Sequence, residues 1–328
     1  MIYAVYVATR DASTTVRARR ANAERARLMR RPPVPERGTR VALLAPAGAL
    51  RGADDLRRAE ANTRSLFWEP VAGAHVLDRS GYLAGDDRAR LSDLNAALAD
   101  DDIGAIWCAR GGYGAMRLLE HVDYASLRRR PKVFIGYSDI TALHAAFATR
   151  CEIVTYHGPT ARATLTTFSR DSLERAIAGQ DSCGLAENAT TLHGGRARGH
   201  LIGGNLALLC ALVGTPFEPI FDGAILVVED VNEAVYRVDR MLTQLVLAGR
   251  LQRCAAIAFG AFTEVPVDAP VEQLGARSLS DVLAETALRL GVPCISGIPV
   301  GHIDDQWTLP LGAQVELDAD ARCLRILG

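Results

Sequence analysis

The stretch Val133-Phe-Ile-Gly-Tyr-Ser-Asp-Ile-Thr141 decides how the rest of the chain is interpreted. Its apolar, β-branched start predicts a buried strand, Gly136 interrupts the run, and residues 142–148 have a helical composition. Ser138 therefore falls at a strand-to-helix corner, where backbone N–H groups without an intrahelical partner and the helix dipole favour negative charge. A nucleophilic serine needs this setting. The alternative is that Ser138 or Asp139 only caps the helix, because both residue types are preferred caps.

Predicted strands and helices alternate on both sides of this corner, from residue 40 to residue 156. Such alternation implies an α/β fold, with a parallel sheet covered by helices on both faces. Ligands of these folds bind beyond the carboxyl ends of the strands. The glycine-rich segment Arg110-Gly-Gly-Tyr-Gly114 follows a predicted strand at 103–109, so we expect it to share one site with Ser138.

Composition divides the chain into four segments. Residues 1–38 end in an arginine- and proline-rich run and predict a poorly ordered extension; their order of apolar and basic residues is the reverse of a secretory signal. Residues 39–160 form the predicted nucleophile domain. Residues 161–196, rich in Thr, Ser, Ala and Gly, predict an interdomain connection with one short helix. Residues 197–328, where alternation resumes, predict a smaller C-terminal domain of mixed strands and helices.

Composition also excludes several classes of function. A net charge of −1 gives no electrostatic basis for binding nucleic acid or an anionic membrane, and no apolar run approaches the ~20 residues of a membrane-spanning helix. Lys132 is the only lysine, so there is no phosphate-binding G-x-x-x-x-G-K-[ST] loop. The seven cysteines are scattered without a C-x-x-C pair, which predicts reduced thiols in a cytoplasmic protein.

Three side chains are predicted to lie just past the ends of apolar strands: Ser138, Glu229 and His302. A serine hydroxyl is protonated at neutral pH and needs an imidazole within hydrogen-bond reach to accept its proton. A carboxylate on the other ring nitrogen orients the imidazole and stabilises its charged form. The three residues together therefore predict a catalytic triad.

Other residues could fill the roles of the acid and the base in this predicted triad. Glu229 competes with the nearby acids Asp230, Glu233 and Asp239, and His302 has a rival base in His157. A histidine at a strand end is also often just solvated. No two histidines have the spacing of metal ligands, which argues against a metal-dependent hydrolase.

The segment Arg110-Gly-Gly-Tyr-Gly114 has two interpretations. Glycines often form only a tight turn, but they also let backbone N–H groups approach a ligand closely. The amide of Gly112, with the amide of Asp139, is a candidate oxyanion hole. The segment does not match the dinucleotide fingerprint G-x-G-x-x-G.

Six motifs in series resemble those of the serine LD-carboxypeptidase family, which includes muramoyl-tetrapeptide carboxypeptidases and microcin C immunity peptidases. They run in order from about residue 39 to the C-terminus: Val41-Ala-Leu-Leu-Ala-Pro-Ala-Gly48; Arg110-Gly-Gly-Tyr-Gly114; Gly136-Tyr-Ser-Asp139; Gly203-Gly-Asn205; Glu229-Asp230 with Tyr236-Arg-Val-Asp-Arg240; and Gly301-His302 with Thr308-Leu-Pro-Leu-Gly312. The corner itself is not the G-x-S-x-G elbow of α/β-hydrolases, because Ile140 stands where that motif needs glycine.

The resemblance implies a flavodoxin- or class I amidotransferase-like N-terminal domain with the nucleophile, and a C-terminal domain with the glutamate and histidine. It implies a homodimer without metal or cofactor, acting on murein tetrapeptides in the cytoplasm. By motif position the triad falls on Ser138, Glu229 and His302, and the amide donors on Gly112 and Asp139.

Two further residues are candidates for substrate contact. Arg110 suits recognition of a carboxylate because its guanidinium is planar and bidentate, although a structural ion pair is an equal alternative. Tyr113 lies in the same segment.

Three other functions stay open at this point. A microcin-type immunity peptidase would cleave an aminoacyl or peptidyl nucleotide analogue, but residues 160–196 contain no tryptophan to grip a nucleobase. A non-catalytic ligand binder would use the serine and histidine only as lining residues. A cysteine-dependent amidotransferase would need a cysteine where Ser138 stands.

Overall fold

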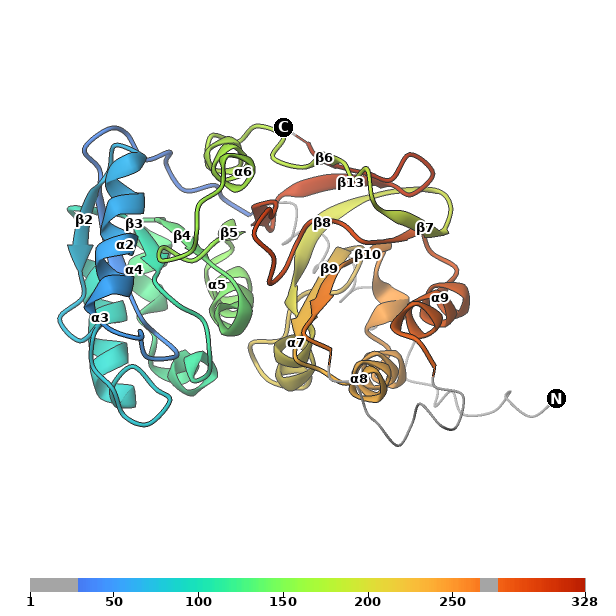
Figure 1. Ribbon diagram of the computed structural model, residues 1–328, viewed down its shortest axis with the longest axis horizontal. Helices are drawn as coiled ribbons and strands as arrows, with labels where there is room; N and C mark the ends of the chain where they lie inside the picture. The colour runs from blue at the N-terminus through green and yellow to red at the C-terminus, as the bar shows by residue number, and fades with distance from the viewer. Residues whose placement is uncertain (1–28, 266–276, 328) are drawn as a thin grey trace.

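A six-stranded sheet forms the N-terminal half of the computed structural model, which describes residues 29–265 and 277–327 (Figure 1). Its strand order is β12-β5-β4-β3-β1-β2, in which β12 alone is antiparallel to its neighbour. The order 2-1-3-4-5 is that of flavodoxin-like folds, which confirms the predicted fold. The strands are β1 (Arg40–Leu44), β2 (Glu69–Ala72), β3 (Ile103–Cys108), β4 (Val133–Gly136), β5 (Thr155–His157) and β12 (Leu309–Leu311).

Helices cover both faces of this sheet. The elements are α2 (Ala53–Ser65), α3 (Asp87–Ala99), the 3₁₀ helix η1 (Ala115–His121), α4 (Tyr124–Arg129), the 3₁₀ helix η2 (Ser138–Ile140), α5 (Thr141–Cys151) and α6 (Thr167–Ile177). Side chains of α3, η1, α4 and α5 pack in one buried cluster with Ile106 and Phe134, whereas α2 and α6 pack in another with Trp107 and Ile135. Successive strand residues point to opposite faces, so one apolar run serves both clusters.

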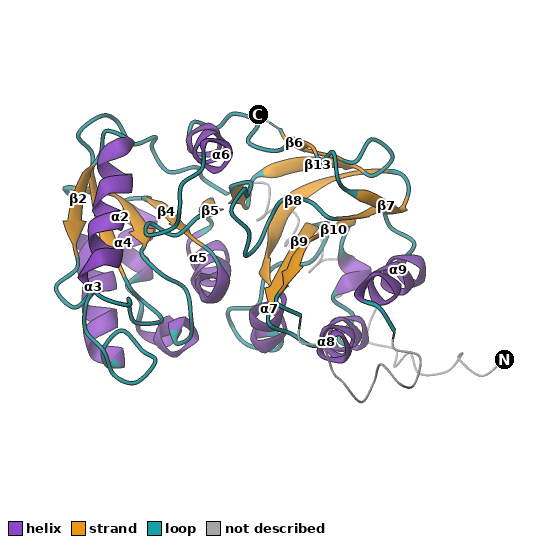
Figure 2. Cartoon of the chain, in the orientation of Figure 1, coloured by secondary structure: helices purple, strands orange, loops and turns teal. Residues whose placement is uncertain are grey.

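An eight-stranded sheet forms the C-terminal half, in the order β6-β14-β13-β8-β9-β10-β11-β7. Strands β8 to β11 are parallel, and the remaining strands join antiparallel. Figure 2 shows α7, α8 and α9 along one side of this sheet, where their side chains form one buried cluster. The elements are β6 (Gly184–Leu185), β7 (Thr190–His193), β8 (Arg196–Asn205), α7 (Leu206–Leu212), β9 (Ile225–Val231), α8 (Val235–Leu247), η3 (Leu251–Arg253), β10 (Ala256–Thr263), α9 (Leu279–Leu290), β11 (Cys294–Ser296), β13 (Gln314–Asp318) and β14 (Cys323–Ile326).

No helix within the described residues has both the length and the apolar character to cross a membrane.

The C-terminal part of the chain crosses back into the first sheet. Strand β12 pairs antiparallel with β5, so residues 309–311 complete the sheet that carries Ser138. Conversely β6 and β7, within the segment expected to be a connection, are strands of the second sheet. These strands pair with partners far away in the sequence, so no local sequence pattern predicts the pairing. The division of the chain at residues 160 and 197 stays a prediction.

The structure differs from the sequence analysis for residues 29–38, which were expected to belong to a poorly ordered extension. The backbone N–H of Arg30 donates to Glu152 O at 2.8 Å, and Arg30 O accepts from Val154 at 2.9 Å. The Arg30 side chain donates to Arg128 O at 2.7 Å. Residues 1–28 lie outside the described residues.

Glycine at position 203 lets β8 and β9 pair without obstruction. A Cβ atom on Gly203 would lie 2.0 Å from Val227 O in the neighbouring strand. We therefore expect Gly203→Ala to lower the free energy of unfolding by about 2–4 kcal/mol, as measured by urea denaturation. Gly214→Ala is the control, because Gly214 has φ +81 but open space around it, and it should cost about 1 kcal/mol. Equal losses would show that the contact with β9 is not the cause.

Candidate active site

Ser138 lies at the corner between β4 and α5, as the first residue of η2. Its φ of +65° is in the left-handed region, which few non-glycine residues adopt and which is common where geometry serves a site. Glycine at position 111 leaves room for this serine: a Cβ atom on Gly111 would lie 2.8 Å from Ser138 Cβ. Neither η2 nor α5 has a side-chain hydrogen bond at its N-cap, so neither Ser138 nor Asp139 caps a helix here. The structure therefore places a strained serine at the corner without the capping role.

His144 holds the strand end just before this corner. It is buried, and burial lowers its pKa to about 4, so the ring is neutral. Its Nε2–H donates to Gly136 O at 2.8 Å, and its Nδ1 accepts from the Thr155 hydroxyl at 2.9 Å. His144 thus fixes the backbone two positions before Ser138.

Asp139 ties the corner to the glycine-rich segment. Its side chain is 2% exposed, and Oδ2 accepts from the backbone N–H of Ala115 at 2.7 Å. Burial raises the pKa of this carboxyl from 3.8 to about 6, and the N–H groups of Ala115 and Gly114 and the charge of Arg90 act in the opposite direction. The Asp139 side chain therefore fixes the loop 110–114, while its own backbone amide stays free for another partner.

The two amides expected to act as donors belong to Gly112 and to Asp139, the residue that follows Ser138. Gly112 has φ +111°, and the carbonyl of the preceding Gly111 accepts from Gly48 N at 2.9 Å. Neither the Gly112 N–H nor the Asp139 N–H donates to an acceptor in the part of the chain that the structure describes. Unpaired backbone donors beside a hydroxyl are what an oxyanion hole requires.

The raised pKa of Asp139 predicts a pH dependence of stability. Its folded-state pKa of about 6 lies above the unfolded value of 3.8, so its contribution to stability is most favourable in acid and is lost as pH rises through this window. A difference of about two pKa units corresponds to about 3 kcal/mol. We therefore expect the wild type to lose stability relative to Asp139→Asn as pH rises. The difference between their free energies of unfolding should shift by up to about 3 kcal/mol. Parallel pH profiles of the two proteins would contradict the assignment.

Glu229 and His302 form a hydrogen-bonded pair. His302 Nδ1 lies 2.8 Å from Glu229 Oε2, so Nδ1–H donates to the carboxylate and Nε2 is left as the basic nitrogen. The carboxylate is fully buried, and Oε1 has no partner within the described residues. Burial raises the pKa of Glu229, and the hydrogen bond from His302 opposes that rise. Glu229 belongs to β9 itself, not to the loop after it, which corrects the expected position.

The pair reaches the Ser138 corner through Tyr137. The rings of His302 and Tyr137 are 4.8 Å apart at an interplanar angle of 60°. Ser138 Oγ itself has no hydrogen bond to any residue that the structure describes, and catalytic hydrogen bonds of this kind often tighten only when substrate is bound. The structure thus brings the imidazole against the residue that precedes the serine.

The rival base His157 is enclosed. It has no exposed surface, and burial lowers its pKa well below 6.5. Neither ring nitrogen has a partner among the described side chains and backbone groups, and the ring centroid is 6.0 Å from that of Tyr137. A substrate cannot reach His157 as it stands, so the geometry favours His302 as the base.

The competing acids have other partners. Asp230 accepts from Asn205 Nδ2 at 2.7 Å and from Ala207 N at 3.0 Å. Glu233 pairs with Arg237, and Asp239 pairs with Arg277 at 3.3 Å. Asn205, which sequence reasoning gave no role, thus joins the ends of β8 and β9; its place in a Gly-Gly-Asn motif was the available signal.

Two serines of α6 anchor the loop that follows His302, and the sequence gave no sign of them. Ser169 Oγ donates to Asp304 O at 2.8 Å and accepts from Gln306 N at 2.9 Å. Ser172 Oγ accepts from Thr308 N at 2.8 Å. A helix from the expected connection therefore positions the loop that carries the imidazole.

The two candidates for substrate contact are placed differently. Arg110 follows β3 directly, and its guanidinium donates to Ala49 O beside the glycine-rich segment. Tyr113 is about half exposed and packs edge-on against Tyr82, with ring centroids 5.4 Å apart. Arg110 thus contacts the loop that follows β1, whereas Tyr113 packs against another exposed aromatic ring.

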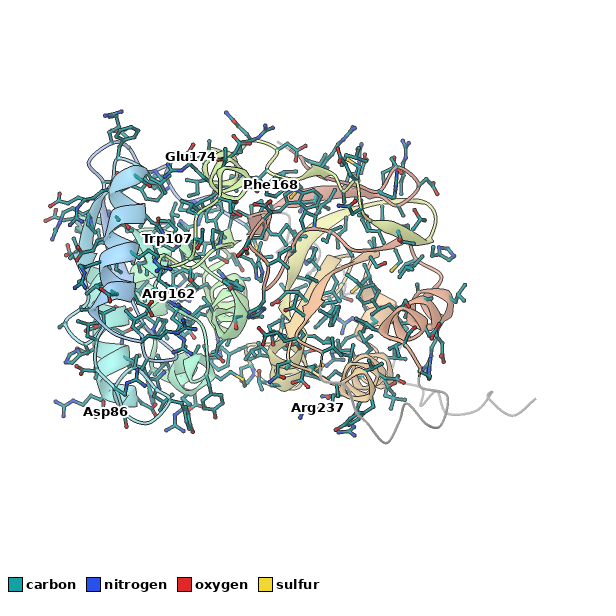
Figure 3. All side chains as sticks on the ribbon, in the orientation of Figure 1. Asp86, Trp107, Arg162, Phe168, Glu174 and Arg237 are labelled. Atoms are coloured by element: carbon teal, nitrogen blue, oxygen red, sulfur yellow. The ribbon has the colours of Figure 1, made fainter. Side chains whose placement is uncertain are left out.

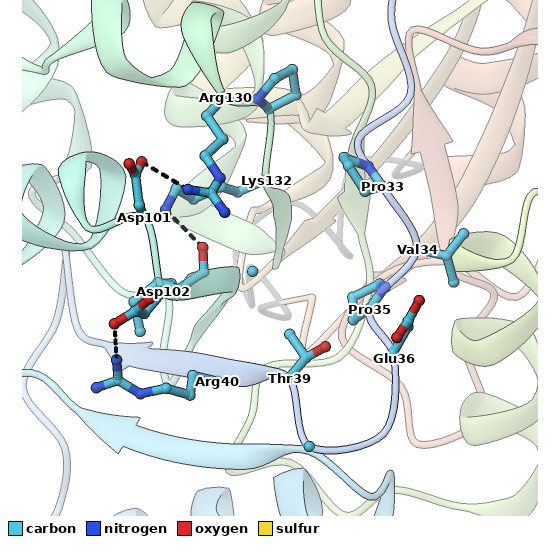
Figure 4. Close-up of a pocket in the computed structure, with 14 residues that line it drawn as sticks. Pro33, Val34, Pro35, Glu36, Thr39, Arg40, Asp101, Asp102, Arg130 and Lys132 are labelled. Atoms are coloured by element: carbon cyan, nitrogen blue, oxygen red, sulfur yellow. Dashed lines mark hydrogen bonds and ion pairs between the residues drawn. The ribbon is translucent and has the colours of Figure 1, made fainter.

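A pocket of about 450 Å³ lies at the opposite end of the first sheet, where β1 and β3 begin (Figure 4). Arg130 pairs there with Asp101 at 2.9 Å. The buried Lys132 donates to the backbone carbonyls of Asp100 and Ile103. The single lysine of the chain thus supports the loop before β3 and lies away from Ser138.

The described part of the chain has no group of three or more His, Cys, Asp or Glu side chains placed to share a metal ion. All seven cysteines are free, and six of them are buried.

Both halves of the chain match known protein domains. Residues 41–158 match the LD-carboxypeptidase N-terminal domain, and residues 198–317 match the LD-carboxypeptidase C-terminal domain. The chain is 37% identical over 299 residues to the murein tetrapeptide carboxypeptidase of Pseudomonas aeruginosa, covering 86% of this chain and 94% of that protein.

Solved structures share the fold. The muramoyltetrapeptide carboxypeptidase from Oxalobacter formigenes superposes with a TM-score of 0.77 at 30% identity, covering 88% of this chain and 98% of that chain. The microcin C7 self immunity protein MccF, in complex with glutamyl sulfamoyl guanosine, superposes with a TM-score of 0.81 at 21% identity, covering 90% and 98%. The second likeness shows the fold alone.

Proposed function

The chain belongs to the LD-carboxypeptidase family, and we propose that it hydrolyses the bond between meso-diaminopimelate and the terminal D-alanine of murein tetrapeptides. Relatives with a murein peptidase name support the substrate class. The observation that carries the proposal is the 2.8 Å pair of His302 and buried Glu229, held against the corner of Ser138.

In the first half of the proposed reaction, Ser138 Oγ attacks the carbonyl on the L-configured centre of diaminopimelate while His302 Nε2 accepts its proton. The negative charge that develops on the carbonyl oxygen is held by the N–H groups of Gly112 and Asp139, which have no other acceptor. Glu229 stabilises the imidazolium. His302 then protonates the departing amine of D-alanine.

In the second half, a water molecule replaces the departed D-alanine. His302 accepts a proton from that water, the hydroxide attacks the ester on Ser138, and the same two amides hold the oxyanion again. The ester bond breaks and Ser138 regains its proton from His302. The products are D-alanine and a tripeptide with a free carboxylate.

We further propose that the enzyme is a cytoplasmic homodimer. Seven free cysteines support a reducing compartment, and the dimer follows from the family resemblance. Light scattering on the eluting peak of a sizing column measures the mass directly, and a monomer at working concentration would contradict the dimer.

Mass spectrometry of muropeptides incubated with the enzyme tests the function. The expected change is conversion of tetrapeptides to tripeptides with release of one alanine, while pentapeptides stay intact. The contrasting substrate is an aminoacyl-sulfamoyl adenosine, which a microcin-type immunity peptidase would cleave. Turnover of that compound without turnover of the tetrapeptide would replace the proposed function.

A further inference from the structure

Four arginines gather around the loop that follows β1, and a single carboxylate accompanies them. They are Arg51 in that loop, Arg79, Arg110 and Arg162, and the carboxylate is the buried Asp55 in the first turn of α2. Arg162 lies in the N-terminal half of the molecule, as Figure 3 labels it. The group therefore carries a surplus of positive charge.

The hydrogen bonds of these arginines do not neutralise their positive charge. Arg110 donates to Ala49 O, and Arg79 Nη2 donates to Leu50 O at 2.7 Å. Both acceptors are uncharged backbone carbonyls. Within the described residues, no carboxylate lies at ion-pair distance from Arg51, Arg79 or Arg110.

The Asp55 carboxylate accepts a hydrogen bond from the backbone of one arginine but makes only a long contact with the side chain of another. Its Oδ2 accepts from the backbone N–H of Arg51 at 2.9 Å, and Arg162 Nη1 lies 3.6 Å away, beyond a hydrogen bond. Arg162 Nε is buried without a partner among the described groups. Asn62 Nδ2 donates to Ala161 O and Ala163 O at 2.8 Å each, so the backbone around Arg162 is held in place. A prepositioned guanidinium with an unused buried N–H is suited to an external acceptor.

Electrostatics agree with this geometry. The pKa of Arg110 is lowered, first by burial and then by the charges of Arg162, Arg51 and Arg79, with Asp55 acting in the opposite direction. The mutual repulsion of guanidinium groups is relieved when an anion binds among them.

The group lies next to the nucleophile. A Cβ atom on Gly48 would lie 3.5 Å from Arg110 Nε and 3.3 Å from Gly112 Cα, so the arginine crosses the loop that supplies the amide donor. Gly111, between Arg110 and Gly112, leaves no room for a side chain against Ser138, because a Cβ atom there would lie 3.1 Å from Ser138 Oγ. An anion bound by the arginines is thus within the reach of one or two residues of a peptide whose carbonyl lies at Ser138.

We propose that Arg51, Arg79, Arg110 and Arg162 form a subsite for the terminal carboxylate of the peptide, with Arg162 as its main ligand. This inference rests on the proposed function and explains how such an enzyme would select the last bond of a chain. Planar guanidinium groups match a carboxylate with two parallel hydrogen bonds. An interior peptide bond offers no such anion and would leave the arginines without a partner.

Binding is measured by titration calorimetry with the Ser138→Ala protein, which keeps the peptide intact. The probes are the tetrapeptide with a free terminal carboxylate and the same peptide with a terminal amide. We expect the acid to bind about 10- to 100-fold more tightly than the amide. In Ser138→Ala/Arg162→Gln this preference should fall below about threefold, and Arg162→Lys should restore part of it because charge returns without the bidentate geometry.

The matched control is Arg64→Gln in the same Ser138→Ala background. Arg64 is exposed on α2 and pairs with Glu60 at 3.2 Å, so the preference for the acid should be unchanged. Equal binding of acid and amide, no binding of either, or a preference that survives Arg162→Gln would each overturn the subsite. Release of D-alanine by the wild-type enzyme is assayed separately, so a failure of the proposed function is distinguished from a failure of this inference.

Discussion

Replacing Ser138 with alanine is expected to lower kcat for D-alanine release by about 10⁴- to 10⁶-fold, the loss typical of removing a nucleophile from a triad. The corner, with φ +65°, presents this hydroxyl beside the glycine-rich segment and next to the backbone amide of Asp139. Activity is measured as D-alanine released from tetrapeptide by purified protein.

The fold should survive this substitution. Ser138 Oγ makes no hydrogen bond within the described residues, so removing it leaves no buried partner unsatisfied, and the melting temperature should be nearly unchanged. Ser92→Ala, in α3, is the matched control and should retain full activity. If cleavage persists in Ser138→Ala, the serine mechanism is wrong. If the wild type binds tetrapeptide without cleaving it, the protein is a ligand binder.

Replacing Glu229 with glutamine is expected to lower kcat by about 10³- to 10⁴-fold, as when the acid of a triad becomes an amide. The present carboxylate accepts from His302 Nδ1 and so leaves Nε2 free to take the serine proton. An amide NH₂ at this position instead favours the tautomer with the proton on Nε2, which cannot act as a base.

The same Glu229→Gln substitution should leave the stability of the protein unchanged or raise it, although it lowers the activity. Burial raises the pKa of Glu229, so at neutral pH the ionised carboxyl is costly to keep in the interior, and the neutral amide removes that cost. We therefore expect an unchanged or higher melting temperature together with the loss of activity. Glu233→Gln, which changes a neighbouring acid paired with Arg237, is the control and should stay active. If Glu233→Gln lost most of its activity while Glu229→Gln lost none, Glu233 and not Glu229 would be the acid of the triad.

Much of the fold was predictable because its signals are local. Apolar runs such as the one at 133–136 and the helical composition at 142–148 depend on neighbouring residues only, and the structure confirms the alternation they predict. The pairing of β12 with β5 has no local signal, because pairing across about 150 residues follows from the packing of the whole chain. The same holds for β6 and β7 within the expected connection.

The candidate site also has features that local sequence predicts and features that depend on contacts between distant residues. The sequence by itself determined the family, the α/β fold and three candidate residues, because residue type and local apolar pattern are read along the chain; it placed Glu229 just after a strand, whereas Glu229 belongs to β9. Only the tertiary structure decided that His302 contacts Glu229 while His157 is enclosed, that Asp139 holds the glycine-rich loop, and that α6 anchors the histidine loop. Burial and hydrogen bonds between residues far apart in the chain exist only after the two sheets have packed together, and no local pattern encodes them.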